Sequence, residues 1–227
     1  MADKHQDFVC SYLRLNGYFT IPNFIIHAAD DTKRVVSGTV GNYTEIDLMG
    51  IRMPYSVEQT AHLKIANDPL LVAGAEGKFD VVIGEVKGGA TNKPNAAWRP
   101  GAHAHPLEDL VRFMGLLPSE AEIKRNADIL SRTYRCETNR CRMRYLIFAE
   151  KPNAHYRSLG VQYITFREIA RFLVDVRGQC WLDSGLGVAS SHPQWDPLLL
   201  KVFHVANDCS LPIDERTDRV IDALSES

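Results

Sequence analysis

The stretch Lys78 to Lys87, KFDVVIGEVK, has the strongest strand pattern of the chain. Five of its ten residues are apolar and nearly continuous, which is typical of a strand buried in the centre of a sheet. Glu85 and Lys87 lie two positions apart at its end, so on a strand they point to the same face. The stretch therefore predicts a central strand that ends in a carboxylate and an ammonium group.

These two charges need either a partner or a ligand. Burying a charge without compensation is costly, so Glu85 and Lys87 either pair with each other or hold a ligand. Gly84 stands before them, and Gly88 and Gly89 follow, which leaves room for a close approach to the backbone. From the residues alone, both a simple strand-end ion pair and a ligand site remain open.

A second acidic pair lies on an earlier predicted strand, Gly41 to Met53. Glu45 and Asp47 are two positions apart and share a face, while Ile46 points to the opposite face. Carboxylates and a backbone carbonyl are ligands that suit Mg²⁺, and a nearby lysine can orient water and stabilise charge on a phosphate. The residue types therefore favour metal-assisted phosphodiester hydrolysis, although Glu45 also fits a solvated strand residue.

The remaining elements predict a mixed α/β sheet with helices on both faces, because strands alternate with helices along the chain. Helices are expected at Gln6–Asn16, Leu107–Leu117, Glu120–Tyr134, Phe166–Arg177 and Pro193–Ala206, with another near Glu58–Ile65. Further strands are expected at Tyr18–His27, Arg144–Ala149 and Gly160–Thr165, with Pro22 forcing a bend or an edge position. Loops are expected at Gly88–His105 and Gly178–His192, and a frayed tail from Asn207.

This order of elements, with Asp47 in TEIDLMG and with Glu85 and Lys87 in VVIGEVKGG, resembles the PD-(D/E)XK nuclease superfamily. The resemblance implies the restriction-endonuclease-like fold, a mixed central sheet flanked by helices, and a nuclease acting on DNA. It further implies that Asp47 and Glu85 bind a divalent metal, Mg²⁺ or Mn²⁺, and that the carbonyl of Val86 adds a ligand. Lys87 would then be the catalytic lysine.

Two positions depart from the pattern of that family. Many members carry an acid on the first helix, about eleven residues before the glycine that ends it. Counting back from Gly17 leads to Gln6, which weakens the case for a second metal site. The proline of the family name is also missing, and Glu45 stands two residues before Asp47. We therefore expect Gln6 and Glu45 to be auxiliary residues.

The resemblance covers Gln6 to Arg177, which predicts a nuclease-like core at residues 1–177. Residues 178–227 would form a C-terminal helical extension with an acidic tail. Many nucleases of this fold act as dimers, so a homodimer is admitted, as are partner proteins of a DNA repair or defence system. The alternative function is a PD-(D/E)XK-like domain without catalysis, which binds nucleic acid or serves as an assembly subunit of a larger complex.

Charge is distributed unevenly along the chain. The net charge of −2 excludes a protein that holds polyanions by bulk positive charge. The tail from Asn207 has six acids and two arginines, so the rest of the chain is at +2. A basic stretch runs from Lys124 to Arg144, and either a DNA-binding stripe or a solvated helix face explains it. The candidate nucleic-acid contacts are Lys124, Arg125, Arg132 and Arg135.

The remaining signals concern location and one loop. The chain has five cysteines, no charged-then-apolar leader and no long apolar stretch, which favours the cytoplasm and argues against a membrane span. His103 and His105 lie in the loop after Lys87. They fit a proton donor or a phosphate contact, but exposed histidines of a flexible loop are the preferred interpretation.

Overall fold

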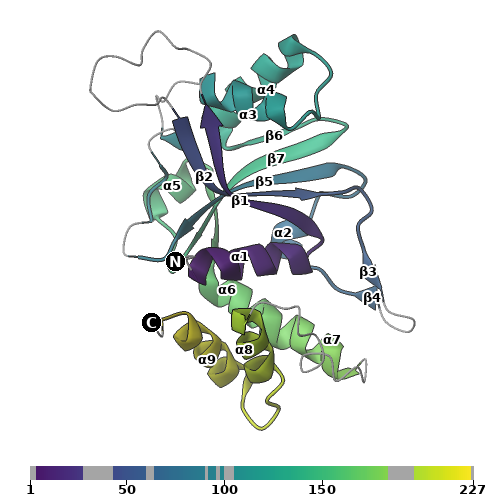
Figure 1. The fold of residues 1–227 in the computed structure, drawn as a ribbon, viewed down its shortest axis with the longest axis vertical. Coiled ribbons are helices and arrows are strands. Elements are labelled where there is room, and N and C mark those ends of the chain that lie inside the picture. Colours follow the sequence, from purple (N-terminus) through teal and green to yellow (C-terminus); the bar gives the residue numbers. More distant parts are fainter. Residues whose placement is uncertain are drawn as a thin grey trace.

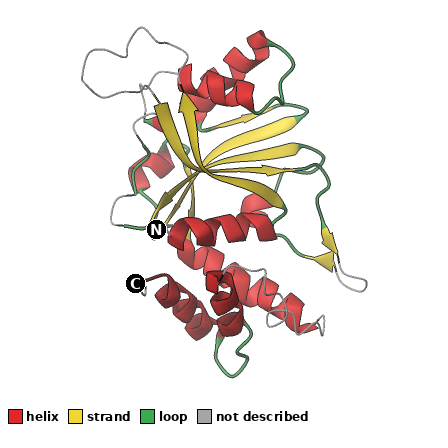
Figure 2. Cartoon of the chain, viewed as in Figure 1, coloured by secondary structure: helices red, strands yellow, loops and turns green. Residues whose placement is uncertain are grey.

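The computed structural model describes residues 4–27, 43–59, 64–89, 92–95, 98–99, 105–183 and 197–225. Within these residues, the chain forms a mixed sheet with the strand order β1-β2-β5-β7-β6, and β8 pairs with β7 (Figure 1). Helices α3 and α4 lie on one side of the sheet, and α1 with the C-terminal helices lies on the other (Figure 2). This arrangement confirms the predicted α/β class and the mixed sheet flanked by helices.

The strands have the following bounds: β1 (Tyr18–His27), β2 (Tyr43–Arg52), β3 (Glu58–Gln59), β4 (Lys64–Ile65), β5 (Phe79–Lys87), β6 (Arg135–Glu137), β7 (Cys141–Ala149) and β8 (Gln162–Thr165). The helices are α1 (Lys4–Leu15), α2 (Pro69–Val72), α3 (His105–Phe113), α4 (Glu120–Thr133), α5 (Ala154–Ser158), α6 (Phe166–Arg171), the π-helical η3 (Phe172–Arg177), α7 (Gly178–Asp183), α8 (Pro197–Ala206) and α9 (Ile213–Ser225). The strand β1 is an edge strand, as Pro22 predicts.

The strand β5 is central and buried, as its apolar run predicts. It pairs antiparallel with β2 on one side and parallel with β7 on the other. Gly84 has no room for a side chain between the neighbouring strands, because a Cβ there would lie 2.7 Å from Cδ1 of Leu48. The room at Gly84 is therefore filled by Leu48 and Phe148, which corrects the expectation that a ligand approaches it.

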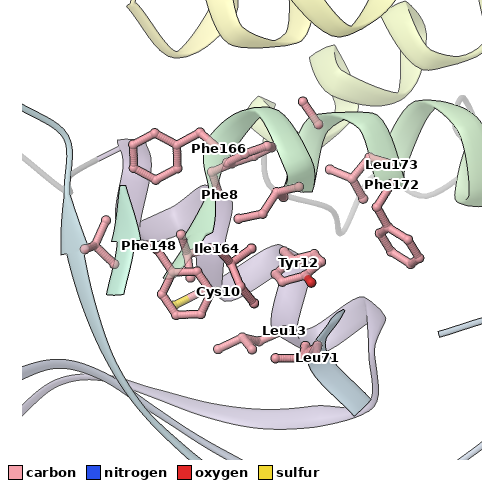
Figure 3. Packing of buried hydrophobic residues seen from close by; sticks show 14 of the residues in the cluster. Phe8, Cys10, Tyr12, Leu13, Leu71, Phe148, Ile164, Phe166, Phe172 and Leu173 are labelled. Carbon is pink, nitrogen blue, oxygen red and sulfur yellow. The ribbon is translucent and has the colours of Figure 1, made fainter. Parts of the chain in front are cut away.

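The two faces of β5 enter two apolar clusters. Val81 and Ile83 pack with the residues beneath α3 and α4. Val82 and Val86 pack on the other face against α1 and α6, in the cluster that Figure 3 shows around Tyr12 and Phe148. Because successive side chains of a strand alternate between faces, β5 joins both clusters. The sheet thereby fixes the position of the charged residues at the end of β5.

The helix expected near Glu58 to Ile65 is wrong. Glu58–Gln59 and Lys64–Ile65 instead form the short antiparallel strands β3 and β4. A helix of this length is marginal in water unless it buries an apolar face. Of the side chains described here, Ile65 is buried and Lys64 is exposed, which is the alternation of a strand.

The C-terminal part corrects two further expectations. Residues 178–183, expected to be loop, continue the preceding helical turns as α7. The tail expected to be frayed instead forms α9, whose Val220 and Leu224 are buried in the same apolar cluster as α1 and α6. Its acidic face pairs with α6 through Arg167–Asp218 and Arg171–Asp214. The division of the chain at residue 177 stays a prediction.

Candidate active site

Asp47 and Glu85 meet where the pairing of β2 and β5 ends. The last paired residues there are Leu48 and Gly84, so Asp47 and Glu85 are the next residues on the two strands. The backbone N–H of Val86 donates to Oδ2 of Asp47 over 2.7 Å. The structure therefore brings the two predicted carboxylates together, and the Asp47 side chain is anchored to the end of β5.

Glu85 is held by hydrogen bonds although it is only 2% exposed. Its Oε2 accepts hydrogen bonds from the hydroxyl of Tyr145 and, over 3.0 Å, from the backbone N–H of Asn95. Oε1 forms an ion pair with Nζ of Lys87. Burial raises the pKa of the Glu85 carboxyl, and the Lys87 and Asn95 contacts offset part of this rise. One oxygen is thus fixed by neutral donors and the other faces the ammonium.

Lys87 contacts the same loop residue as Glu85. Its Nζ donates to Oδ1 of Asn95 over 3.1 Å, while the backbone N–H of Asn95 binds Glu85. The Lys87 side chain keeps 19% of its surface exposed, whereas that of Glu85 keeps 3%. The ammonium therefore lies between the buried carboxylate and the solvent, and the pairing expected of a strand-end ion pair is present.

The first helix also reaches the site. Nε2 of Gln6 donates to the backbone oxygen of Asp47 and, over 2.9 Å, to Oδ1 of Asn23 on β1. Asn23 adopts a φ of 52°, a left-handed conformation that asparagine tolerates better than most residues. Gln6 therefore stands beside Asp47, as its place on the helix predicts, and it contributes an amide instead of a carboxylate.

The glycines after β5 differ from each other. A Cβ at Gly88 would lie 2.5 Å from Nδ1 of His5, so the start of α1 fills this space. His5 in turn lies 4.9 Å from the ring of Phe166, measured between centroids. No atom of the described residues lies within 4 Å of a Cβ at Gly89. The space expected for a ligand is therefore filled at Gly88, whereas the described residues leave the space at Gly89 open.

The sequence analysis did not assign Tyr145 or Asn95 to the site, and it placed Asn95 and Trp98 within the loop expected at Gly88–His105. Tyr145 is buried on β7, and the ring of Trp98 stacks on it at 4.2 Å. Trp98 thereby pins its loop to the core. Glu85 pairs with Ile147 on β7, and Tyr145 lies two residues before Ile147. The sequence cannot show that Tyr145 is near Glu85, because this register is not known from the sequence. Asn95 gave only the loop signal of its surroundings.

The structure leaves other predicted residues apart from the site or undescribed. Glu45 pairs through its backbone with Ile25, and its side chain is not among those described. His103 and the side chain of His105 also lie outside the described residues, although His105 begins α3. The expectations for these three side chains therefore lie outside the described residues.

The predicted nucleic-acid contacts lie on α4 and β6, and β7 separates β6 from β5. All four side chains are exposed: Lys124, Arg125, Arg132 and Arg135. Arg132 pairs with Asp128 and Arg135 with Glu137.

The basic stretch ends in residues that do not face the solvent. Arg142 and Arg144 are buried and bind Asp80, so their assignment to a surface stripe is wrong. The basic stretch in the sequence includes Arg142 and Arg144, because the sequence does not show that the buried Asp80 lies on the neighbouring strand β5.

The donor set fits one divalent cation. Asp47 and Glu85 offer carboxylate oxygens, and Val86 offers its carbonyl, which are the hard ligands that Mg²⁺ and Mn²⁺ take. Apart from its ion pair, Oε1 of Glu85 has no hydrogen-bond donor among the described residues. In that part of the chain, no group of three or more His, Cys, Asp or Glu side chains could hold a metal. With Gln6 at the helix position, a second cation lacks a carboxylate.

The helices were also checked for membrane spans, and the chain was compared with known proteins. In the described part of the chain, no helix is both long and apolar enough to cross a lipid bilayer. No protein-family model, no curated protein and no solved structure matches this sequence or fold.

Proposed function

We propose that this protein is a divalent-metal-dependent DNA nuclease of the PD-(D/E)XK type with the restriction-endonuclease-like fold. The observation that carries the proposal is the meeting of Asp47 and Glu85 at the end of the β2–β5 pairing, with Lys87 in contact with Glu85. Carboxylates that share a site with a lysine at a strand end suit phosphodiester hydrolysis. The central position of β5 holds these groups rigidly.

Asp47, Glu85 and the carbonyl of Val86 would hold Mg²⁺ or Mn²⁺. A bound cation supplies a Lewis acid for the phosphate and lowers the pKa of a coordinated water. Lys87 would donate hydrogen bonds from Nζ to the attacking water or to a phosphate oxygen, where charge develops in the transition state. Asn95 steers that ammonium, because it binds both Lys87 and Glu85. Gln6 fixes the backbone at Asp47.

The proposal is tested by incubating the purified protein with plasmid, linear duplex and single-stranded DNA in Mg²⁺ or Mn²⁺. We expect cleavage that stops when EDTA is added. The Glu85→Gln variant, purified in the same way, is the control for a contaminating nuclease, because a contaminating activity would persist in that preparation. Cleavage that is equal in both preparations contradicts the proposal.

The alternative is a nucleic-acid-binding or assembly domain without catalysis. One observation favours it: Gln6 offers an amide where many family members have an acid, and that amide binds protein atoms of Asp47 and Asn23. Calorimetric titration with Mn²⁺ in the presence of a short DNA duplex separates the two functions. Metal binding that is lost in Asp47→Asn supports the nuclease, and DNA binding without metal binding supports the alternative.

Tyr145→Phe should weaken metal binding about tenfold, since hydrogen bonds that orient a metal ligand are typically worth 10- to 100-fold in affinity. The hydroxyl of Tyr145 and the N–H of Asn95 hold Oε2 of Glu85, and this leaves Oε1 turned toward Lys87. Without the hydroxyl, the carboxylate loses one of the two donors that fix its orientation. The measurement is the Mn²⁺ dissociation constant from electron paramagnetic resonance, together with the Mn²⁺ concentration for half-maximal cleavage.

Tyr12→Phe is the matched control. Tyr12 lies on α1, and its buried hydroxyl donates over 2.8 Å to Oδ2 of Asp68 and not to Glu85. We expect wild-type Mn²⁺ affinity in this variant and similar melting temperatures for both. Equal Mn²⁺ affinity in Tyr145→Phe and wild type would show that the hydroxyl does not orient the ligand.

A further inference from the structure

The site lies at one end of the sheet, where three parallel strands end. In the register of β5, β7 and β8, Lys87 stands beside Ala149, and Ala149 stands beside Thr165. The carboxyl edge of parallel strands is where α/β proteins commonly bind their ligands. The short helix α5, which follows β7, lies beside the sheet here (Figure 1).

A strap of asparagines ties these segments together. Nδ2 of Asn92 donates to the backbone oxygen of Lys151 over 3.0 Å, and Nδ2 of Asn153 donates to Oδ1 of Asn92 over 3.1 Å. Three residues later, Asn95 binds Glu85 and Lys87. The segment 92–95 therefore links the catalytic candidates directly to the loop between β7 and α5.

Both segments joined by these asparagines carry exposed basic side chains. Lys93 lies between the two asparagines and is exposed, and the Lys151 side chain is 80% exposed. Arg99 is also exposed, and its Nε donates over 2.9 Å to the backbone oxygen of Pro94 in the same segment. In the described residues of these segments, the exposed acid is Glu150, 3.9 Å from Lys151. These exposed residues thus carry an excess of positive charge on the two segments that the asparagines join.

The surface of α4 differs in this balance. Its three basic residues, Lys124, Arg125 and Arg132, are matched by three acids, Glu120, Glu122 and Asp128. Two of these charges, Arg132 and Asp128, already form an ion pair within the helix. A polyanion is attracted by a local excess of cations, and phosphate contacts are made by such groups. The segments joined by the asparagines have such an excess of cations, and α4 does not.

We propose that Lys93, Lys151 and Arg99, named here the strap rim, bind the DNA backbone on either side of the phosphate that reaches Glu85 and Lys87. This assignment rests on the proposed function for the position of the reacting phosphate. It replaces the basic face of α4 as the DNA contact. The strap holds the two lysines at a fixed position relative to the site, so the rim sets the register of the DNA backbone.

The test compares two double variants with the same change of net charge. Lys93→Gln/Lys151→Gln removes the two exposed ammonium groups of the rim, and Lys124→Gln/Arg125→Gln removes two charges of α4. Neither change removes a hydrogen bond of the strap, because the strap uses the backbone oxygen of Lys151. Binding of a fluorescent duplex is measured by anisotropy in EDTA, which prevents cleavage, over a series of KCl concentrations.

We expect the rim variant to bind more weakly and to reduce the slope of log K against log [KCl] by about 2, since each phosphate contact contributes about 0.9. The α4 variant should keep the wild-type slope. A reduced slope in the α4 variant with an unchanged slope in the rim variant overturns the inference, as does tighter binding to an RNA duplex of the same sequence. Melting temperatures of both variants show whether they are folded.

Failure of the rim and failure of the nuclease give different results. If the rim variant loses DNA affinity while the wild-type protein does not cleave DNA in Mn²⁺, the surface stands and the nuclease proposal falls. If the wild-type protein cleaves DNA in a metal-dependent manner and the rim variant binds and cleaves as well as wild type, the surface falls and the nuclease proposal stands.

Discussion

Glu85→Gln and Lys87→Ala are each expected to lower the rate of metal-dependent DNA cleavage by about 10³-fold. Glutamine keeps the volume of Glu85 and an oxygen for the donors of Tyr145 and Asn95, but it removes the negative charge that a cation needs. Alanine at Lys87 removes the ammonium that lies between Glu85 and the solvent. The measurement is the initial cleavage rate at saturating Mn²⁺ and DNA.

A second ion pair near the opposite end of β5 provides matched controls. Lys78 stands directly before β5 and pairs over 2.5 Å with Glu137 on β6. Glu137→Gln and Lys78→Ala make the same chemical changes at a more exposed pair, and they should leave the cleavage rate unchanged. Wild-type rates in folded Glu85→Gln and Lys87→Ala would remove these residues from the reaction. Circular dichroism confirms that each variant is folded.

The sequence predicted β5 and the charged residues at its end because their pattern is local. A nearly continuous apolar run is visible within ten residues, and the alternation of a strand places Glu85 and Lys87 on one face. That Asp47 lies beside Glu85 was expected only from the resemblance to a family. Their contact depends on the register of β2 against β5, which a one-residue shift would destroy.

Residues whose partners are far along the chain were predicted poorly. Arg142 and Arg144 were counted in the basic stretch because they follow other basic residues along the chain. An acid inside the apolar run of β5 was the available signal, since Asp80 cannot be buried without positive partners. Likewise, the many acids of α9 suggested a frayed tail, although Val220 and Leu224, four residues apart, mark an apolar stripe.

Asp80→Asn is expected to lower the free energy of unfolding by about 3–5 kcal/mol, the effect of breaking a buried ion pair from one side. Asp80 is fully buried. It accepts hydrogen bonds from Nε and Nη2 of Arg142, over 2.8 and 2.6 Å, and from Nη2 of Arg144 over 2.8 Å. The hydroxyl of Tyr18 also donates to it. Without the carboxylate charge, two buried guanidinium groups lose their shared counter-charge.

Urea unfolding followed by circular dichroism measures this loss, and Asp218→Asn is the control. Asp218 pairs with Arg167 on the surface, where both side chains are more than half exposed. An exposed pair contributes about 0–1 kcal/mol, so the same substitution there should be almost neutral. Equal losses in the two variants would mean that the Asp80 cluster adds no more to stability than a surface pair.

The same cluster predicts how stability depends on pH. Burial alone would raise the pKa of Asp80, but the hydrogen bond from Arg142 and the charge of Arg144 lower it below the usual value of 3.8. A carboxyl whose pKa is lower in the folded state stabilises the fold above its unfolded value, and this stabilisation is lost as the pH falls through the folded value. Wild-type protein should therefore lose part of its advantage over Asp80→Asn below about pH 4. A difference in unfolding free energy that stays constant from pH 7 to pH 3 would contradict this origin of the stability.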